Sequence, residues 1–102
     1  DVGGLELVLP GTTLTMAFDS TGKVNGSSGC NTYSASYLVE GSQLAFTPPT
    51  GTNILCSTPD GIMEQEAAFL ELLPEIGGYS IEGNSLYLKN ATGTVVAELV
   101  VY

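Results

Sequence analysis

The sequence predicts a mainly β fold, a sandwich or barrel of about seven to eight short strands, with one α-helix around residues 59–73. Apolar and polar residues alternate with period two along most of the chain, and turn-forming residues interrupt them about every 8–12 positions. Thr, Ser, Gly and Val are abundant while Arg, His and Trp are absent, which favours strands and turns. One segment breaks the alternation and predicts the helix.

The first half of the chain contains five expected strands. They lie at residues 5–9, 14–18, around Val24, 33–39 and 44–46. Glycine, proline and acidic residues separate them, and Pro48-Pro49 ends the last one because proline has no N–H to give to a ladder.

The last third repeats the pattern. Apolar side chains alternate through two hairpin-like turns, at residues 82–84 and 90–93. Tyr79, Ile81, Leu86, Leu88, Val95, Ala97, Leu99 and Val101 are the apolar members of these three strands. The number and spacing of the segments are typical of a sandwich or barrel.

The predicted helix begins at Thr58-Pro59-Asp60, a capping hydroxyl followed by a proline in the first turn and an acid near the positive end of the dipole. It ends near Leu73, before Pro74. At about 100° per residue, one arc is apolar while Glu64 and Glu71 point to solvent. The arc consists of Ile62, Met63, Phe69, Leu70 and Leu73.

Glu66 falls in the middle of this apolar arc. A carboxylate there must accept hydrogen bonds or take up a proton, because burying it without partners is costly. We expect Glu66 to tie the helix to nearby loop N–H or hydroxyl groups. The alternatives are a buried acid in a functional pocket and a helix of different phase.

The chain has 102 residues and is expected to form a single domain, residues 1–102. Its net charge is −9, and its only cations are Lys23 and Lys89. Two lysines cannot supply the phosphate contacts of a nucleic-acid site, nor dock the chain on an anionic membrane. No apolar run reaches the ~20 residues that span a bilayer. Because the chain starts at Asp1 without Met, we expect it to be processed or trimmed, so that any leader or lipid anchor would have been removed.

The residue types present exclude several chemistries. Without His there is no Ser-His-Asp or Cys-His arrangement and no zinc site of Cys/His type, so no catalytic, metal or cofactor residues are predicted. A hydrolase with paired carboxylates is the least favoured hypothesis, because Glu64, Glu66 and Glu71 do not share one helix face. A calcium site at Asp19 and Ser20 is less expected than an ordinary turn, because no calcium-loop motif surrounds them.

Cys30 and Cys56 are the only cysteines. An even count in a small acidic chain without metal-ligand spacing favours a disulfide over the alternative, two buried free thiols. Closing this loop would stabilise the fold by about 3 kcal/mol in the chain-entropy model. No base or cation lies near either cysteine in the sequence, which disfavours a reactive thiol.

The segment Gly26-Ser27-Ser28-Gly29-Cys30-Asn31-Thr32-Tyr33, with Tyr37, resembles the G-x-x-G-C-N-x-Y-x-x-x-Y signature of the HslJ/META domain family. Cys56, the Met63-Glu64-Gln65-Glu66 run and the Leu86-Tyr87-Leu88 hairpin also resemble family motifs, so the resemblance covers residues 14–102. The chain departs from the family pattern in lacking a Trp in its first strand. A threonine that usually precedes the second cysteine motif has only Thr52 as a counterpart.

The resemblance implies a small, lipocalin-like antiparallel barrel with one helix. Such domains occur in bacterial and archaeal envelope proteins, often lipoproteins; some are heat-inducible or linked to antibiotic tolerance, and a eukaryotic member is linked to motility and virulence. The resemblance carries over structural residues only: Gly29, Cys30, Asn31, Tyr33, Cys56 and Glu66.

The preferred hypothesis is therefore a non-enzymatic extracytoplasmic domain that binds a partner or has a structural role in envelope stress response or maintenance. The expected partner, if any, is an envelope protein, and the expected state is a monomer. The alternative is a barrel that carries a small ligand in its interior. Large inward residues such as Phe18, Tyr37 and Phe46 favour a filled core over that alternative.

Overall fold

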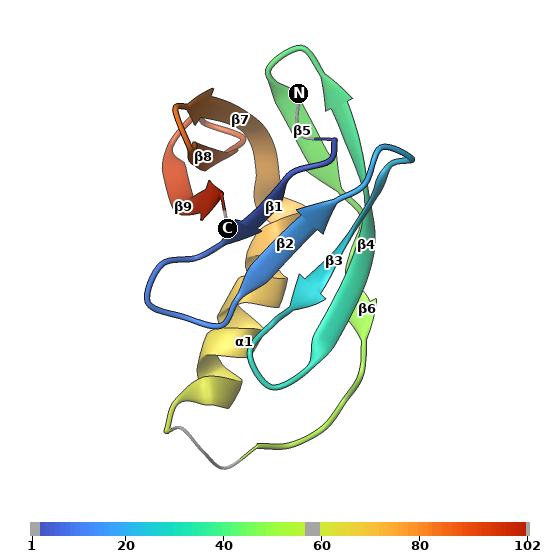
Figure 1. Cartoon of the computed structure of the whole chain (residues 1–102), viewed down its shortest axis with the longest axis vertical. Helices are drawn as coiled ribbons and strands as arrows, with labels where there is room; N and C mark the ends of the chain where they lie inside the picture. Colours follow the sequence, from blue (N-terminus) through green and yellow to red (C-terminus); the bar gives the residue numbers. More distant parts are fainter. Residues whose placement is uncertain (1–2, 57–59, 102) are drawn as a thin grey trace.

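The computed structural model describes residues 3–56 and 60–101, and it confirms a mainly β architecture with one short α-helix (Figure 1). The described strands are β1 (Glu6–Val8), β2 (Thr15–Phe18), β3 (Lys23–Ser27), β4 (Thr32–Glu40), β5 (Gln43–Phe46), β6 (Thr50–Gly51), β7 (Ile76–Glu82), β8 (Ser85–Asn90) and β9 (Val95–Val101). Helix α1 (Ile62–Leu72) and a 3-10 turn, η1 (Leu73–Glu75), lie between β6 and β7.

The strands form a closed antiparallel barrel. Their order is β3-β2-β1-β9-β8-β7-β5-β4, and β3 pairs with β4 to complete the ring. The two-residue β6 pairs with the beginning of β4, outside this ring of eight. Every expected strand segment is present, and β6 is the strand that sequence periodicity did not indicate.

Two junctions of the barrel are short. β5 and β7 are paired at Gln43 and Gly78, and β1 and β9 are paired through Leu7–Val101 and Val8–Val100. The ladders within β7–β9 and among β3, β4 and β5 are longer, whereas β2 and β3 pair only at Ala17–Asn25 and Phe18–Val24. The β7–β9 meander is thus a well-paired part that meets the rest of the barrel along two short ladders.

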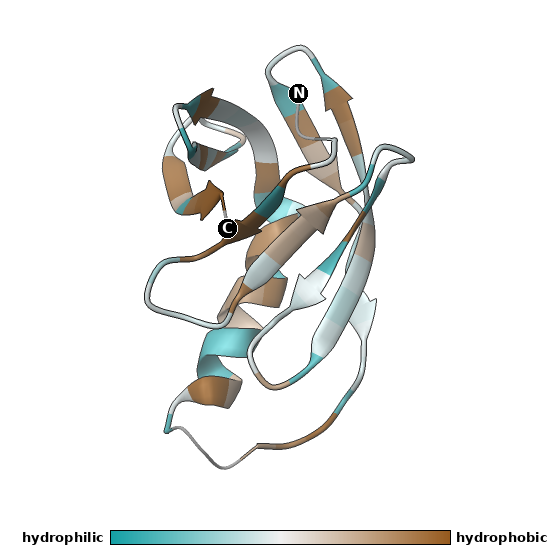
Figure 2. Cartoon of the chain, viewed as in Figure 1, coloured by the Kyte–Doolittle hydropathy of each residue, from teal (hydrophilic) through white to brown (hydrophobic). Residues whose placement is uncertain are grey.

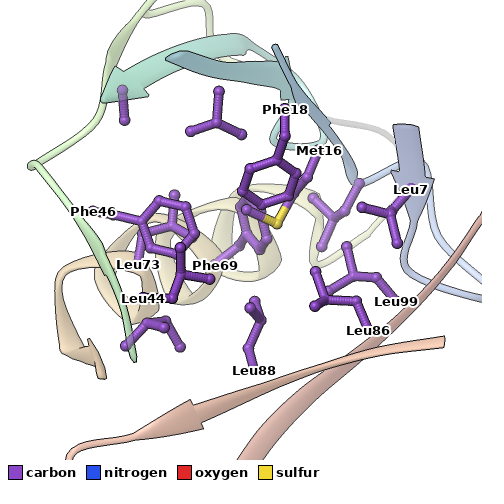
Figure 3. Packing of buried hydrophobic residues seen from close by; sticks show 14 of the residues in the cluster. Leu7, Met16, Phe18, Leu44, Phe46, Phe69, Leu73, Leu86, Leu88 and Leu99 are labelled. Atoms are coloured by element: carbon purple, nitrogen blue, oxygen red, sulfur yellow. The ribbon is translucent and has the colours of Figure 1, made fainter. Parts of the chain in front are cut away.

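The core fills the barrel. Phe18 and Met16 from β2 point towards Leu86 and Leu88 from β8, while Phe69 of α1 closes the space between them (Figure 3). The rings of Phe18 and Phe46 lie 6.0 Å apart. These large side chains occupy the middle of the barrel, which disfavours the interior carrier hypothesis.

The helix starts later than predicted. Asp60 lies in a turn, and Gly61, in the left-handed conformation with φ of 83°, precedes the first helical residue, Ile62. A left-handed residue cannot continue a helix, so the predicted start near residue 59 is wrong for the part that is described. Thr58 and Pro59, the predicted cap, lie outside the described residues. Pro74 follows the end of α1 as expected and belongs to η1.

Three apolar members of the alternating strands are exposed: Ile81, Val95 and Val101. Ile81 pairs with the buried Leu86 but lies beside the β7–β8 turn, beyond the core. Val95 is exposed for a different reason, because the β8–β9 register shifts between Leu88 and Lys89. Val101 lies at the last described position of β9.

Candidate functional site

The most highly organised polar group lies where α1 meets the β3–β4 turn. Glu66 is 5% exposed and Asn31 4%, and Ser28 is fully buried. We call these three residues the Glu66 cluster. In Figure 2 one turn of α1 appears teal between hydrophobic segments. The low exposure of Glu66 places its carboxylate on the buried side of the helix, as the sequence predicted.

Both oxygens of Glu66 accept hydrogen bonds. Oε1 accepts from the backbone N–H of Asn31 at 2.7 Å and from the Ser28 hydroxyl at 2.8 Å, and Oε2 accepts from the Asn31 side-chain amide at 2.7 Å. Ser28 Oγ also lies 3.0 Å from the Asn31 carbonyl oxygen. Its single proton is better given to the charged carboxylate, the stronger acceptor.

Asn31 connects the cluster to the segment before the helix. Its Oδ1 accepts from the Thr52 hydroxyl at 2.8 Å and from the Ile54 N–H at 2.6 Å, while Nδ2 donates to the Ile54 carbonyl at 2.9 Å as well as to Glu66. All four hydrogen-bonding positions of the side-chain amide are used. Thr52 thus contacts the cluster directly, and it is the residue that the sequence offered as counterpart of the family threonine.

A disulfide joins Cys30 to Cys56, with the two Cα atoms 6.0 Å apart. It links the β3–β4 turn to the same segment that Asn31 holds by hydrogen bonds. Covalent and polar contacts therefore fix the approach to the helix at adjacent points. Neither cysteine is a free thiol.

Gly29 and Tyr33 flank the cluster. Gly29 has a φ of 122°, and a Cβ there would lie 3.2 Å from Ile62 Cδ1, so the turn lies directly against α1. The ring of Tyr33 packs edge-on against Phe69 at 5.5 Å, and its hydroxyl donates to the Thr15 carbonyl at 2.7 Å. Burial raises the pKa of the Tyr33 phenol, which keeps it protonated as a donor.

The electrostatics of Glu66 indicate a structural carboxylate. Burial raises its pKa, but hydrogen bonds from Asn31, Ser28 and the Cys30 backbone outweigh burial and hold the pKa below the ordinary value. A general acid needs the opposite shift, towards neutral pH. Glu64 and Glu71 lie exposed elsewhere on α1, so the helix does not bring an acid pair together.

Asp19 is an acceptor in a turn. One oxygen accepts from the Lys23 N–H and from the N–H and hydroxyl of Thr21. The Lys23 and Thr21 hydrogen bonds lower its pKa. Among residues 3–56 and 60–101, no group of three or more His, Cys, Asp or Glu side chains could hold a metal ion.

Two surface hollows lie beside β6 and beside α1. One, of about 600 Å³, is lined by uncharged residues of β3, β4 and β6 and lies outside the barrel wall. The other, of about 350 Å³, lies between α1 and β9 and is mostly apolar. The sequence indicated neither, because each is formed by segments far apart in the chain.

The polar cluster, the disulfide and the barrel with one helix occur together in a chain whose sequence matches the META domain model over residues 2–100. The chain belongs to the META domain family. The match extends to the first strand, where the missing Trp was a departure from the family pattern. Within the part of the chain that is described, the META domain has no helix long and apolar enough to cross a membrane.

Solved structures resemble this META domain along most of its length. An NMR structure of a protein from Burkholderia xenovorans is 25% identical with a TM-score of 0.78, over 99% of this chain and 83% of that one. A second NMR structure is 20% identical with a TM-score of 0.73, over 98% and 91%. A crystal structure of a DUF4847 family protein from Bacteroides vulgatus is 18% identical with a TM-score of 0.66, over 86% and 58%. No curated protein matches the chain.

Proposed function

We propose that this META domain is a non-enzymatic module that works outside the cytoplasm, as a binding or structural unit in envelope stress response or maintenance. The observation that carries the proposal is the Glu66 cluster. Its buried carboxylate uses both oxygens to hold the β3–β4 turn and has a lowered pKa, so this polar cluster stabilises the structure.

The disulfide supports a location outside the cytoplasm. Bonds between cysteines persist in oxidising compartments and are rare in the cytosol. The Cys30–Cys56 bond crosslinks a segment that the Glu66 cluster also holds, so an oxidising environment stabilises the same part of the fold.

The compartment is tested by the thiol state in the source cells. Cells are treated with an alkylating reagent before lysis, and the protein is then weighed with and without reductant. We expect no alkylation before reduction and two alkylated cysteines after it. Two alkylated thiols without reductant would contradict the proposal.

The role is tested in a strain that lacks the gene. We expect the strain to be more sensitive to detergent and to heat, and the wild-type gene to restore tolerance. Equal tolerance in the deleted and restored strains would count against an envelope role.

The non-enzymatic part is tested by screening ester, glycoside and peptide substrates with the wild type and Glu66→Gln. We expect no turnover by either protein. Turnover that Glu66→Gln abolishes would overturn this part of the proposal and make Glu66 a catalytic acid.

A further inference from the structure

The apolar hollow beside α1 is bordered by three parts of the chain. Gln65, Ala68, Phe69 and Leu72 line it from α1, Leu9 and Leu14 from the β1–β2 connection, and Val96, Ala97 and Leu99 from β9. Its volume of about 350 Å³ lies at the lower end of the range for ligand sites. Gln65 is the only polar side chain in this lining.

The hollow exists because β1 leaves β9 early. The two strands pair as far as Val8 and Val100, and the next residue, Leu9, still pairs with the β2 side, giving its N–H to the Leu14 carbonyl at 2.9 Å. Thr12 then donates to the Leu9 carbonyl through both its N–H and its hydroxyl. The turn through Pro10 therefore carries the chain away from β9, and residues 95–99 pair with β8 alone among the described strands.

β9 is regular where this edge is open, except at one residue. Leu88 pairs with Ala97 and Lys89 with Val95, so Val96 is the extra residue of a bulge. Neighbouring strand residues normally face opposite sides, yet Val96 and Ala97 both line the hollow. Beyond the bulge, residues 97–99 form an edge about 10 Å long next to apolar side chains.

Charge indicates what kind of chain fits this edge. Glu64 and Glu71 are exposed on α1, Glu98 is exposed on β9, and neither lysine lines the hollow. The net charge of −9 opposes the close approach of a second copy of this chain. A segment with basic residues on either side of its apolar ones would be attracted to the same surface.

We propose that the β9 edge and its apolar hollow bind an extended peptide segment of a partner protein, with apolar side chains at alternate positions and basic residues at its ends. The segment lies where β1 would have continued, pairs its backbone with residues 97–99, and places an apolar side chain between Ala68 and Val96. This inference rests on the proposed function, because it names the partner of the binding module.

The probe is the fluorescent peptide Lys-Lys-Thr-Val-Thr-Leu-Thr-Lys, titrated with the full chain and followed by anisotropy. We expect saturable binding. The same peptide N-methylated at alternate residues should bind at least about tenfold more weakly, because it cannot pair along the ladder. A peptide with Glu in place of Lys should also bind more weakly. Equal binding of the N-methylated peptide would overturn the proposal, since the hollow would then take apolar side chains without strand pairing.

Two adjacent alanines on α1 provide a matched pair of variants. Ala68 and Ala67 are both exposed, but only Ala68 lines the hollow. Ala68→Lys should raise the Kd about tenfold, because an ammonium group would have to lose water in an apolar site, and Ala67→Lys should leave it within about twofold. Equal effects of the two variants would overturn the proposed location.

Sedimentation of the free chain tests the alternative occupant of the hollow, a second copy of this chain. We expect a monomer; a dimer that Ala68→Lys dissociates would replace the peptide by a second copy. If no peptide binds while the thiol state and the deletion phenotype are as expected, this inference is rejected and the proposed function remains.

Discussion

The two sides of helix α1 meet the barrel in opposite ways. On one side, Glu66 and its partners bind the β3–β4 turn through buried hydrogen bonds, next to a disulfide. On the other side, Gln65, Ala68 and Leu72 face an apolar hollow next to an open strand edge. The helix is held by polar contacts and a neighbouring disulfide along one side, while its other side is not closed by packing.

The largest effect is expected at Glu66. Glu66→Ala leaves the backbone N–H and one side-chain N–H of Asn31 without an acceptor, while the Ser28 hydroxyl can still donate to the Asn31 carbonyl oxygen. Unsatisfied buried donors cost about 1–3 kcal/mol each. We expect the free energy of unfolding to fall by about 3–5 kcal/mol in urea titrations, with Glu64→Ala as the exposed control on the same helix. If Glu66→Ala lowered the free energy of unfolding no more than Glu64→Ala, the contrast between the two sides of α1 would have no basis.

The disulfide comes next. The double variant Cys30→Ser with Cys56→Ser should lower the free energy of unfolding by about 3 kcal/mol, because the unfolded chain regains the freedom that the crosslink removes. Reduced wild type should match the double variant in the same titration. If reduction has no effect, the hydrogen bonds of Asn31 alone hold the segment.

Acid is expected to act on the same side of α1 with a smaller effect. The pKa of Glu66 is below its ordinary value of 4.5, so its stabilisation is fully present above that value and is lost as pH falls through the lower, folded-state pKa. A protonated carboxyl still accepts hydrogen bonds through one oxygen, which keeps the loss below that of Glu66→Ala. Urea titrations at decreasing pH should bring wild type and Glu66→Gln closer together, and a constant gap between them would contradict the lowered pKa.

The smallest effect is expected on the open side. Gln65→Ala changes the residue next to Glu66 in sequence, yet it should alter the free energy of unfolding by no more than about 0.5 kcal/mol. Alanine suits a helix at least as well as glutamine. Thermal unfolding of Gln65→Ala and Glu66→Ala side by side measures the contrast, which disappears if both lose similar stability.

The sequence predicted the elements better than their assembly. Strand alternation is local, so the apolar runs ending at Phe18, Phe46 and Leu88 were each found. β6 was missed because Thr50 and Gly51 bury no apolar side chain that would reveal a period. The short ladders between β5 and β7 and between β1 and β9 depend on segments far apart in the chain, and periodicity carries no information on these.

The candidate site was predicted in part. The position of Glu66 within an apolar arc indicated a carboxylate that needs partners, and the cysteine count indicated the disulfide. Ser28 was not singled out for this role, because a serine in a turn-rich segment carries no signal of burial. The role of Ile54 was equally hidden, since its contribution is made by backbone atoms.

The two short junctions of the barrel have a consequence for its motions. Opening between β5 and β7 and between β1 and β9 breaks few hydrogen bonds, so the β7–β9 meander can separate as one unit while its own ladders persist. Amide hydrogens of Leu88 and Leu99 would then exchange only on global unfolding, and those at the junctions much sooner. In exchange experiments the closed ring would appear as two cooperative units, joined in sequence by a helix that is anchored to one of them.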